Sequence, residues 1–225
     1  MGLWIAVLVL KLLAADPYAA ARERMVRDDI EDRGARNPAV LHAMRTVPRH
    51  LFVPGSHRGL AYSDQPLPIG YSVTISQPYI VAWMTELLEP SKKHKALEIG
   101  TGSGYQAAVL AGLVDHVYTI EIVPELAESS AEKLRELGYR NVTVREGDGY
   151  KGWPEEAPFD LIILTAAPRE VPKALIDQLA RGGRLVAPVG KGPWSQELIV
   201  LDKRADGSIR RRSMGGVAFV PMVPK

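Results

Sequence analysis

The stretch EIGTGSG at residues 98–104 decides the fold of this chain. Its three glycines alternate with other residues, directly after a short apolar run at residues 96–99 and before a helical pattern at residues 105–113. Glycine lets the backbone turn tightly and approach a ligand, and the amides at a helix start favour bound polar groups. The stretch therefore predicts a strand, a nucleotide-type binding loop and a helix.

Acidic residues follow the next two predicted strands. The spacing of the glycines disfavours a dinucleotide enzyme, because the third glycine of G-x-G-x-x-G would fall at Tyr105. Glu121 ends a predicted strand at residues 117–120 and can accept both hydroxyls of a ribose. Asp148 follows the strand after that and is a candidate adenine contact. Because ligands of open α/β sheets bind at the carboxyl ends of the strands, these groups predict one shared site.

Strands and helices alternate beyond the glycine loop. This alternation predicts an α/β fold with a doubly wound, mostly parallel sheet covered on both faces. Two final strands flank Asp206 and Gly207, which predicts a C-terminal antiparallel hairpin. The expected elements are a helix at 124–137 closed by Gly138, strands at 142–145 and 159–164, a helix at 171–180 ended by Gly182 and Gly183, a strand at 184–189, and hairpin strands at 198–203 and 214–220.

The N-terminal part has a different character. Residues 17–90 read as a cap of helices and loops, which together with the rest of residues 17–225 would form one domain. Residues 1–16 form an apolar extension that is too short for a membrane helix and lacks the basic start of a secretory signal. We expect a start-site extension or a packed helix there, with a targeting segment as the alternative.

Composition excludes several classes of function. A chain of 225 residues with 46% hydrophobic content can bury one full core. A net charge of +2 argues against a nucleic-acid partner, and Arg210–Arg212 read as a solvated face. The absence of cysteine excludes disulfides and thiolate metal sites. The five histidines show no metal-ligand spacing, so no metal is expected.

Several motifs together carry a family resemblance. The glycine loop with Glu121 and Asp148 resembles the cofactor site of class I methyltransferases, a Rossmann-like fold. TISQP at 74–78 resembles the signature of the protein-L-isoaspartate (D-aspartate) O-methyltransferases. Further segments match this family in order, so that the resemblance covers about residues 17–223: FDLIILTAAP at 159–168, LVAPVG at 185–190 and VAFVPM at 217–222.

The resemblance implies S-adenosylmethionine as cofactor, S-adenosylhomocysteine as product, and isoaspartyl peptides and damaged proteins as substrates. It also implies a cytoplasmic monomer without a stable membrane partner, or an exported protein if residues 1–15 act as a signal. It assigns Ser76 as the active-site serine. It implies cofactor contacts at Thr74, Ile75, Glu98, Gly100, Thr101, Gly102, Ser103, Gly104, Glu121, Asp148 and Gly149, and peptide contacts at Ile69, Gly70, Tyr71, Val220 and Pro221.

Physical chemistry gives Ser76 two roles. It can cap a helix expected at residues 77–88, with Pro78 in the first turn. Its hydroxyl and the amides at that helix start can also dock a carboxylate. A carboxylate is already ionised at neutral pH, so we expect Ser76 to orient the acceptor and not to act as a nucleophile.

Three other functions remain open from the sequence. A class I methyltransferase that acts on RNA or on a small metabolite would share the glycine loop. A noncatalytic module could keep the pocket without the chemistry. A dehydrogenase comes last, because of the glycine spacing.

Overall fold

The computed structural model describes residues 16–192 and 195–225. Within these residues a seven-stranded sheet has the order β5-β4-β3-β6-β7-β8-β9. The five strands β3 to β7 run parallel to one another. Strand β8 pairs antiparallel with β7, and β9 pairs antiparallel with β8. The doubly wound sheet and the terminal hairpin are thereby confirmed. The strands are β3 (Lys95–Ile99), β4 (His116–Glu121), β5 (Val142–Glu146), β6 (Phe159–Leu164), β7 (Leu179–Gly190), β8 (Gln196–Lys203) and β9 (Ile209–Val217).

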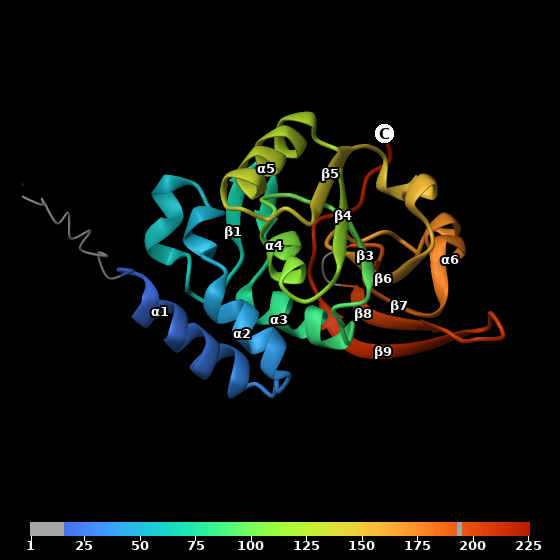
Figure 1. The fold of residues 1–225 in the computed structure, drawn as a ribbon, viewed down its shortest axis with the longest axis horizontal. Coiled ribbons are helices and arrows are strands. Elements are labelled where there is room, and N and C mark those ends of the chain that lie inside the picture. Colours follow the sequence, from blue (N-terminus) through green and yellow to red (C-terminus); the bar gives the residue numbers. More distant parts are fainter. Residues whose placement is uncertain (1–15, 193–194) are drawn as a thin grey trace, which may run out of the picture.

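Helices cover both faces of the sheet (Figure 1). Alternate strand residues point to opposite faces, so Ala96 packs in one core and its neighbour Leu97 in the other. The first core contains residues of α3 (Pro78–Leu87), α4 (Tyr105–Ala111) and α5 (Pro124–Glu136). The second contains Leu175 of α6 (Lys173–Gln178), which contacts the short 3-10 helix η4 (Gly149–Lys151). Another short 3-10 helix, η5 (Pro154–Glu156), precedes β6. Burial on both faces explains why the central strands are continuously apolar.

The elements of the N-terminal cap that precede α3 pack against α3 and α4 (Figure 1). Its helices bury Met25, Ile30 and Met44 in the first core. No helix among the described residues is both long and apolar enough to cross a bilayer. The targeting alternative for residues 1–15 lies outside the described residues and stays a prediction. The cap elements before α3 are α1 (Ala19–Arg24), the π-helix η1 (Met25–Glu31), α2 (Pro38–Thr46), the 3-10 helices η2 (Arg49–Leu51) and η3 (Gly55–Leu60), β1 (Leu67–Gly70) and β2 (Val73–Ile75).

Two predicted boundaries were wrong. The helix expected at residues 171–180 spans Lys173–Gln178, because Leu179 already pairs with Phe159 of β6, and Gly182 and Gly183 lie within β7. The last strand begins at Ile209, directly opposite Lys203, because the Asp206–Gly207 turn is short. The arginines at the start of β9 are paired with acids on β8, so this polar edge strand lacked an apolar signal in the sequence.

A buried hydroxyl joins α3 to α4 and gives a test of the packing. Thr85 Oγ1 donates to Val81 O at 2.7 Å and accepts from Gln106 Nε2 at 2.9 Å, and both side chains are buried. Thr85→Val should lower the free energy of unfolding by about 1–3 kcal/mol, because it leaves the Gln106 amide unpaired.

Urea denaturation measures this loss, with Thr46→Val as the matched control. Thr46 also donates to a helix carbonyl but is exposed, so its replacement should change stability by less than about 0.5 kcal/mol. Equal losses in the two variants would contradict the bridging role of Thr85.

Candidate functional site

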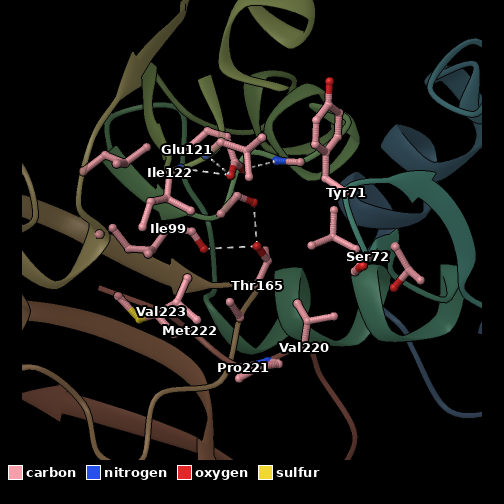
Figure 2. Close-up of a pocket in the computed structure, with 18 residues that line it drawn as sticks. Tyr71, Ser72, Ile99, Glu121, Ile122, Thr165, Val220, Pro221, Met222 and Val223 are labelled. Atoms are coloured by element: carbon pink, nitrogen blue, oxygen red, sulfur yellow. Dashed lines mark hydrogen bonds between the residues drawn. The ribbon is translucent and has the colours of Figure 1, made fainter. Parts of the chain in front are cut away.

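The main cavity, of about 380 Å³, opens at the carboxyl ends of β3, β4 and β6. Strands β4 and β5 extend the sheet on one side of β3, and β6 and β7 extend it on the other. Ligands of doubly wound folds bind at such a switch in strand order. Figure 2 shows Glu121 at the end of β4 and Thr165 just after β6, the two strands that flank β3, with the β1–β2 hairpin turn on one side and the C-terminal segment on another. A volume of this size suits a nucleoside-sized ligand. Its floor consists of Ile99, Gly100, Gly102, Ile120, Glu121, Gly149 and Thr165.

The Glu121 carboxylate organises one side of this cavity. One oxygen accepts from Gly102 N at 2.7 Å, and the other accepts from Ile122 N at 2.9 Å and Val123 N at 3.1 Å. These bonds tie the glycine loop to the segment that leads into α5. A carboxylate has about four acceptor positions, so one remains for a ligand hydroxyl in addition to these three amides.

Thr165 holds the other side of the glycine loop. Its hydroxyl donates to Gly100 O at 2.6 Å and also reaches Ile99 O at 3.0 Å (Figure 2). Gly100 has φ of +98°, and a Cβ there would collide with the Thr165 hydroxyl. Only glycine therefore fits this turn while Thr165 keeps its bonds.

A smaller cavity lies on the other side of the loop and is lined by Ser76, Glu98 and Gln106. Thr74, Gly100, Gly102 and Thr165 line both cavities, so the two meet at the loop. Glu98 is fully buried, and its Oε2 accepts from Thr119 Oγ1 at 2.6 Å. Its Oε1 has no partner among the described residues. A buried acceptor of this kind is costly unless a ligand or water satisfies it.

Burial raises the pKa of Glu98 from its ordinary value of 4.5 to about 8. The Thr119 hydroxyl lowers the pKa of this carboxyl, and the negative charge of Glu121 raises it. Glu98 is therefore protonated at neutral pH in the ligand-free protein. A cation near Oε1 would reverse this preference and favour the carboxylate.

A strained turn forms one wall of the main cavity. Tyr71 and Ser72 connect β1 to β2 with φ of +52° and +59°. Two-residue hairpin turns of this hand normally use asparagine and glycine, so Tyr71 and Ser72, which disfavour positive φ, store strain at the site. The Tyr71 side chain is 55% exposed and stands beside the cavity (Figure 2).

The C-terminal segment forms another wall. Ala167 N donates to Val220 O and Met222 N donates to Ala167 O, both at 2.9 Å. Tyr150 Oη donates to Met222 O at 3.1 Å, which fixes the segment over Gly149. Residues 220–223, which carry or adjoin these bonds, line the cavity.

The structure brings most of the predicted residues together at the two cavities. Tyr71, Glu121, Gly149, Val220 and Pro221 line the main one, as do Thr74, Gly100 and Gly102. Ile75, Ser76, Glu98, Thr101 and Ser103 line the smaller one.

Four predicted residues lie outside both cavities. Asp148 lies next to Gly149 and caps η4 by accepting from Tyr150 N at 2.9 Å. Gly104 starts α4 in the left-handed conformation. Ile69 lines a separate groove with residues 51–54 of the cap, and Gly70 belongs to the hairpin. The assigned roles of these residues stay predictions.

Sequence reasoning missed Thr165 and Met222 as site residues. Thr165 directly follows a predicted strand, so the carboxyl-end rule could have identified it. Met222 had no such signal, because its place depends on how the segment after β9 returns to β6. Within the part of the chain that the structure describes, no group of three or more His, Asp or Glu side chains could hold a metal ion.

The chain is similar to one well-defined family. A family model described as protein-L-isoaspartate(D-aspartate) O-methyltransferase matches residues 20–225. A protein-L-isoaspartate O-methyltransferase of Synechococcus sp. (strain JA-2-3B'a(2-13)) is 56% identical over 216 residues, which is 93% of this chain and 88% of the relative.

Solved structures agree with this match. A structure described as a protein-L-isoaspartate O-methyltransferase is 28% identical with a TM-score of 0.80, covering 89% of this chain and 65% of that one. A Plasmodium falciparum structure, described as a putative member in complex with S-adenosyl-L-homocysteine, has a TM-score of 0.77 at 24% identity and covers 90% of this chain and 98% of that one. At that identity the second likeness concerns the fold alone.

The raised pKa of Glu98 predicts a pH-dependent stability. The folded protein keeps this proton up to about pH 8, whereas the unfolded chain loses it near pH 4.5. Since the folded state binds the extra proton in this window, the stabilising contribution is complete below pH 4.5 and is lost as the pH rises through about 8. Glu98→Gln cannot titrate and should lack this dependence.

Urea denaturation of both proteins from about pH 5 to about pH 9 measures the effect. The stability of the variant relative to the wild type should rise by about 1.4 kcal/mol per pH unit across the window and level off above it. If the difference in stability between Glu98→Gln and the wild type stayed constant with pH, the pKa of Glu98 would not be raised by folding.

Proposed function

The chain belongs to the protein-L-isoaspartate(D-aspartate) O-methyltransferase family and catalyses S-adenosylmethionine-dependent methyl esterification of L-isoaspartyl residues, and we propose that it does so by positioning its reactants without a general base. The observation that carries this proposal is the meeting of the two cavities at the glycine loop. Ser76 faces one of them, and the nucleoside-sized space lies in the other.

The residues present fit S-adenosylmethionine. The main cavity offers the remaining acceptor position of Glu121 to a ribose hydroxyl, with Gly149 and the neighbouring Asp148 at the adenine end. The unpartnered Oε1 of Glu98 suits the ammonium group of the methionine part. When bound, the cofactor supplies an electrophilic methyl group on a sulfonium.

Ser76 orients the acceptor in this proposal. Its hydroxyl donates to the isoaspartyl α-carboxylate, whose pKa of about 3.5 leaves it ionised and nucleophilic at neutral pH. The hydrogen bonds of Gly100 to Thr165 and of Gly102 to Glu121 fix the loop that lines both cavities, and so fix the position of one cavity relative to the other. Fixing the acceptor oxygen in line for transfer supplies much of the acceleration by proximity.

The walls of the main cavity accept the damaged peptide. Tyr71 on the hairpin turn and the backbone of Val220 and Pro221 face the same space from different sides. An isoaspartyl residue with chain on both sides needs such an open cleft. After methylation, the following backbone amide attacks the ester, methanol leaves, and the resulting succinimide hydrolyses partly to normal aspartate.

We also propose one methyltransferase domain at residues 17–225, with residues 17–90 as its cap, acting as a cytoplasmic monomer. The shared first core of cap and sheet supports a single domain. The absence of cysteine is consistent with a reducing compartment. No stable membrane or nucleic-acid partner is included in this proposal.

Methyl transfer to a matched pair of peptides tests the function. Two synthetic peptides differ only in carrying isoaspartate or normal aspartate at one position, and each is incubated with labelled S-adenosylmethionine. Base-labile label should enter the isoaspartyl peptide alone. Label in neither peptide would redirect the search to RNA and small metabolites.

Two variants separate orientation from cofactor binding. Ser76→Ala should lower kcat by about 10- to 100-fold and leave the Kd for S-adenosylmethionine unchanged, because it removes only an acceptor contact. Asp148→Ala should instead raise that Kd by about tenfold through the loss of one hydrogen bond to the adenine. Calorimetric titration and initial rates measure both quantities, and unchanged turnover in Ser76→Ala would refute its role.

A further inference from the structure

Helix α3 is capped by a residue distant in sequence, and not by Ser76 or its neighbour. The N-cap residue is Gln77, whose own side chain makes no capping bond, and Pro78 at the first position has no N–H. The first amide that needs an acceptor is therefore that of Tyr79. Tyr79 N donates to Asp64 Oδ1 at 2.9 Å, so Asp64 performs the capping from a turn of the N-terminal cap.

The same carboxylate holds the residue next to Ser76. Asp64 Oδ2 accepts from Gln77 Nε2 at 2.5 Å and from Arg33 Nη1 at 2.6 Å. The Asp64 side chain is only 13% exposed, which shields these bonds from water. Arg33 also lies over the ring of Tyr79, at 3.6 Å from its centroid. Three contacts thus converge on the start of α3.

These contacts bracket Ser76 on its C-terminal side. On its N-terminal side Ile75 is buried and pairs with Leu67 of β1. Ser76 lies between these two anchors and lines the smaller cavity. Since Asp64 satisfies the helix start, the Ser76 hydroxyl is not needed as a cap and can serve the acceptor.

We propose that Asp64 is a positioning residue for methyl transfer, which sets the pose of Ser76 by capping α3 and holding Gln77. This proposal rests on the orienting role of Ser76 given above. Asp64 touches neither cavity, so it acts through Ser76 and not on the reactants. A displacement of an orienting group by about 1 Å can cost about 100-fold in rate.

A double-mutant cycle between Asp64 and Ser76 tests the proposal. Asp64→Ala should lower kcat for an isoaspartyl peptide by about 10- to 100-fold and change the Kd for S-adenosylmethionine by less than about threefold. In the Ser76→Ala background the same change should slow turnover by no more than about twofold, because the group that it positions is gone. Asp64→Asn keeps an acceptor for Tyr79 N–H and should retain most of the turnover.

Glu86→Ala is the matched control. Glu86, near the end of α3, is another carboxylate that accepts backbone amides of a distant segment, from Arg36 N at 3.0 Å and from Asn37 N at 3.1 Å, just before α2. Its loss should lower stability by an amount similar to that for Asp64→Ala, without the drop in kcat. Should Asp64→Ala fail to fold, Gln77→Leu removes one bond of the same carboxylate and should show the same non-additivity with Ser76→Ala on a smaller scale.

The outcomes separate the two proposals. Unchanged turnover in Ser76→Ala would overturn the role of Ser76 and, with it, the route by which Asp64 acts. A slow Ser76→Ala with a fully active Asp64→Ala, or losses that multiply in the double variant, would overturn the role of Asp64 alone. A slow Glu86→Ala would show that loss of either carboxylate impairs catalysis through stability, which would overturn the positioning role of Asp64.

Discussion

The Glu121 carboxylate accepts three backbone N–H groups, one from the glycine loop and two from the segment that enters α5. These amides have no partner in a regular strand or helix, because both segments turn at this point. The carboxylate satisfies them together and so fixes the distance between the loop and the end of β4. The width of the main cavity depends on this fixed distance, since Gly102 and Glu121 both line it.

Thr165 constrains the loop from the opposite side through the carbonyls of Ile99 and Gly100. Glu121 thus accepts from the N–H of Gly102 in the loop, and Thr165 donates to the carbonyl of Gly100. A loop held at both sides loses little further conformational freedom when a ligand binds, which favours affinity. Glu98 adds a different element, because its buried and unpartnered Oε1 is a cost that a cationic ligand can offset.

The N-terminal cap contributes to the site through side chains as well as by covering the sheet. Asp64 reaches the start of α3, and Glu86 near the end of α3 accepts in return from the amides of Arg36 and Asn37, just before α2. The earlier elements of the cap and α3 therefore hold each other in place, and Ser76 lies where β2 passes into that helix.

The sequence alone determined the fold class, which is a doubly wound and mostly parallel sheet, as well as the glycine loop and its acidic partners. Apolar runs, glycine spacing and the carboxyl-end rule are local patterns, and they sufficed for residues 98–104 and Glu121. The family resemblance of residues 74–78 supplied Ser76. Local patterns did not yield the bounds of α6 and β9, because pairing with β6 and β8 overrode the helix and loop signals there.

Only the tertiary structure decided how these residues are held. The partners of Asp64 lie 13, 15 and 31 positions away along the chain. No local pattern records such contacts, because they arise from the packing of the cap on α3. The same holds for Met222, which reaches Gly149 after the chain leaves the sheet. The sequence determined the chemical groups of the site, and tertiary packing decided which of them meet, since contacts between distant segments form only when the chain folds.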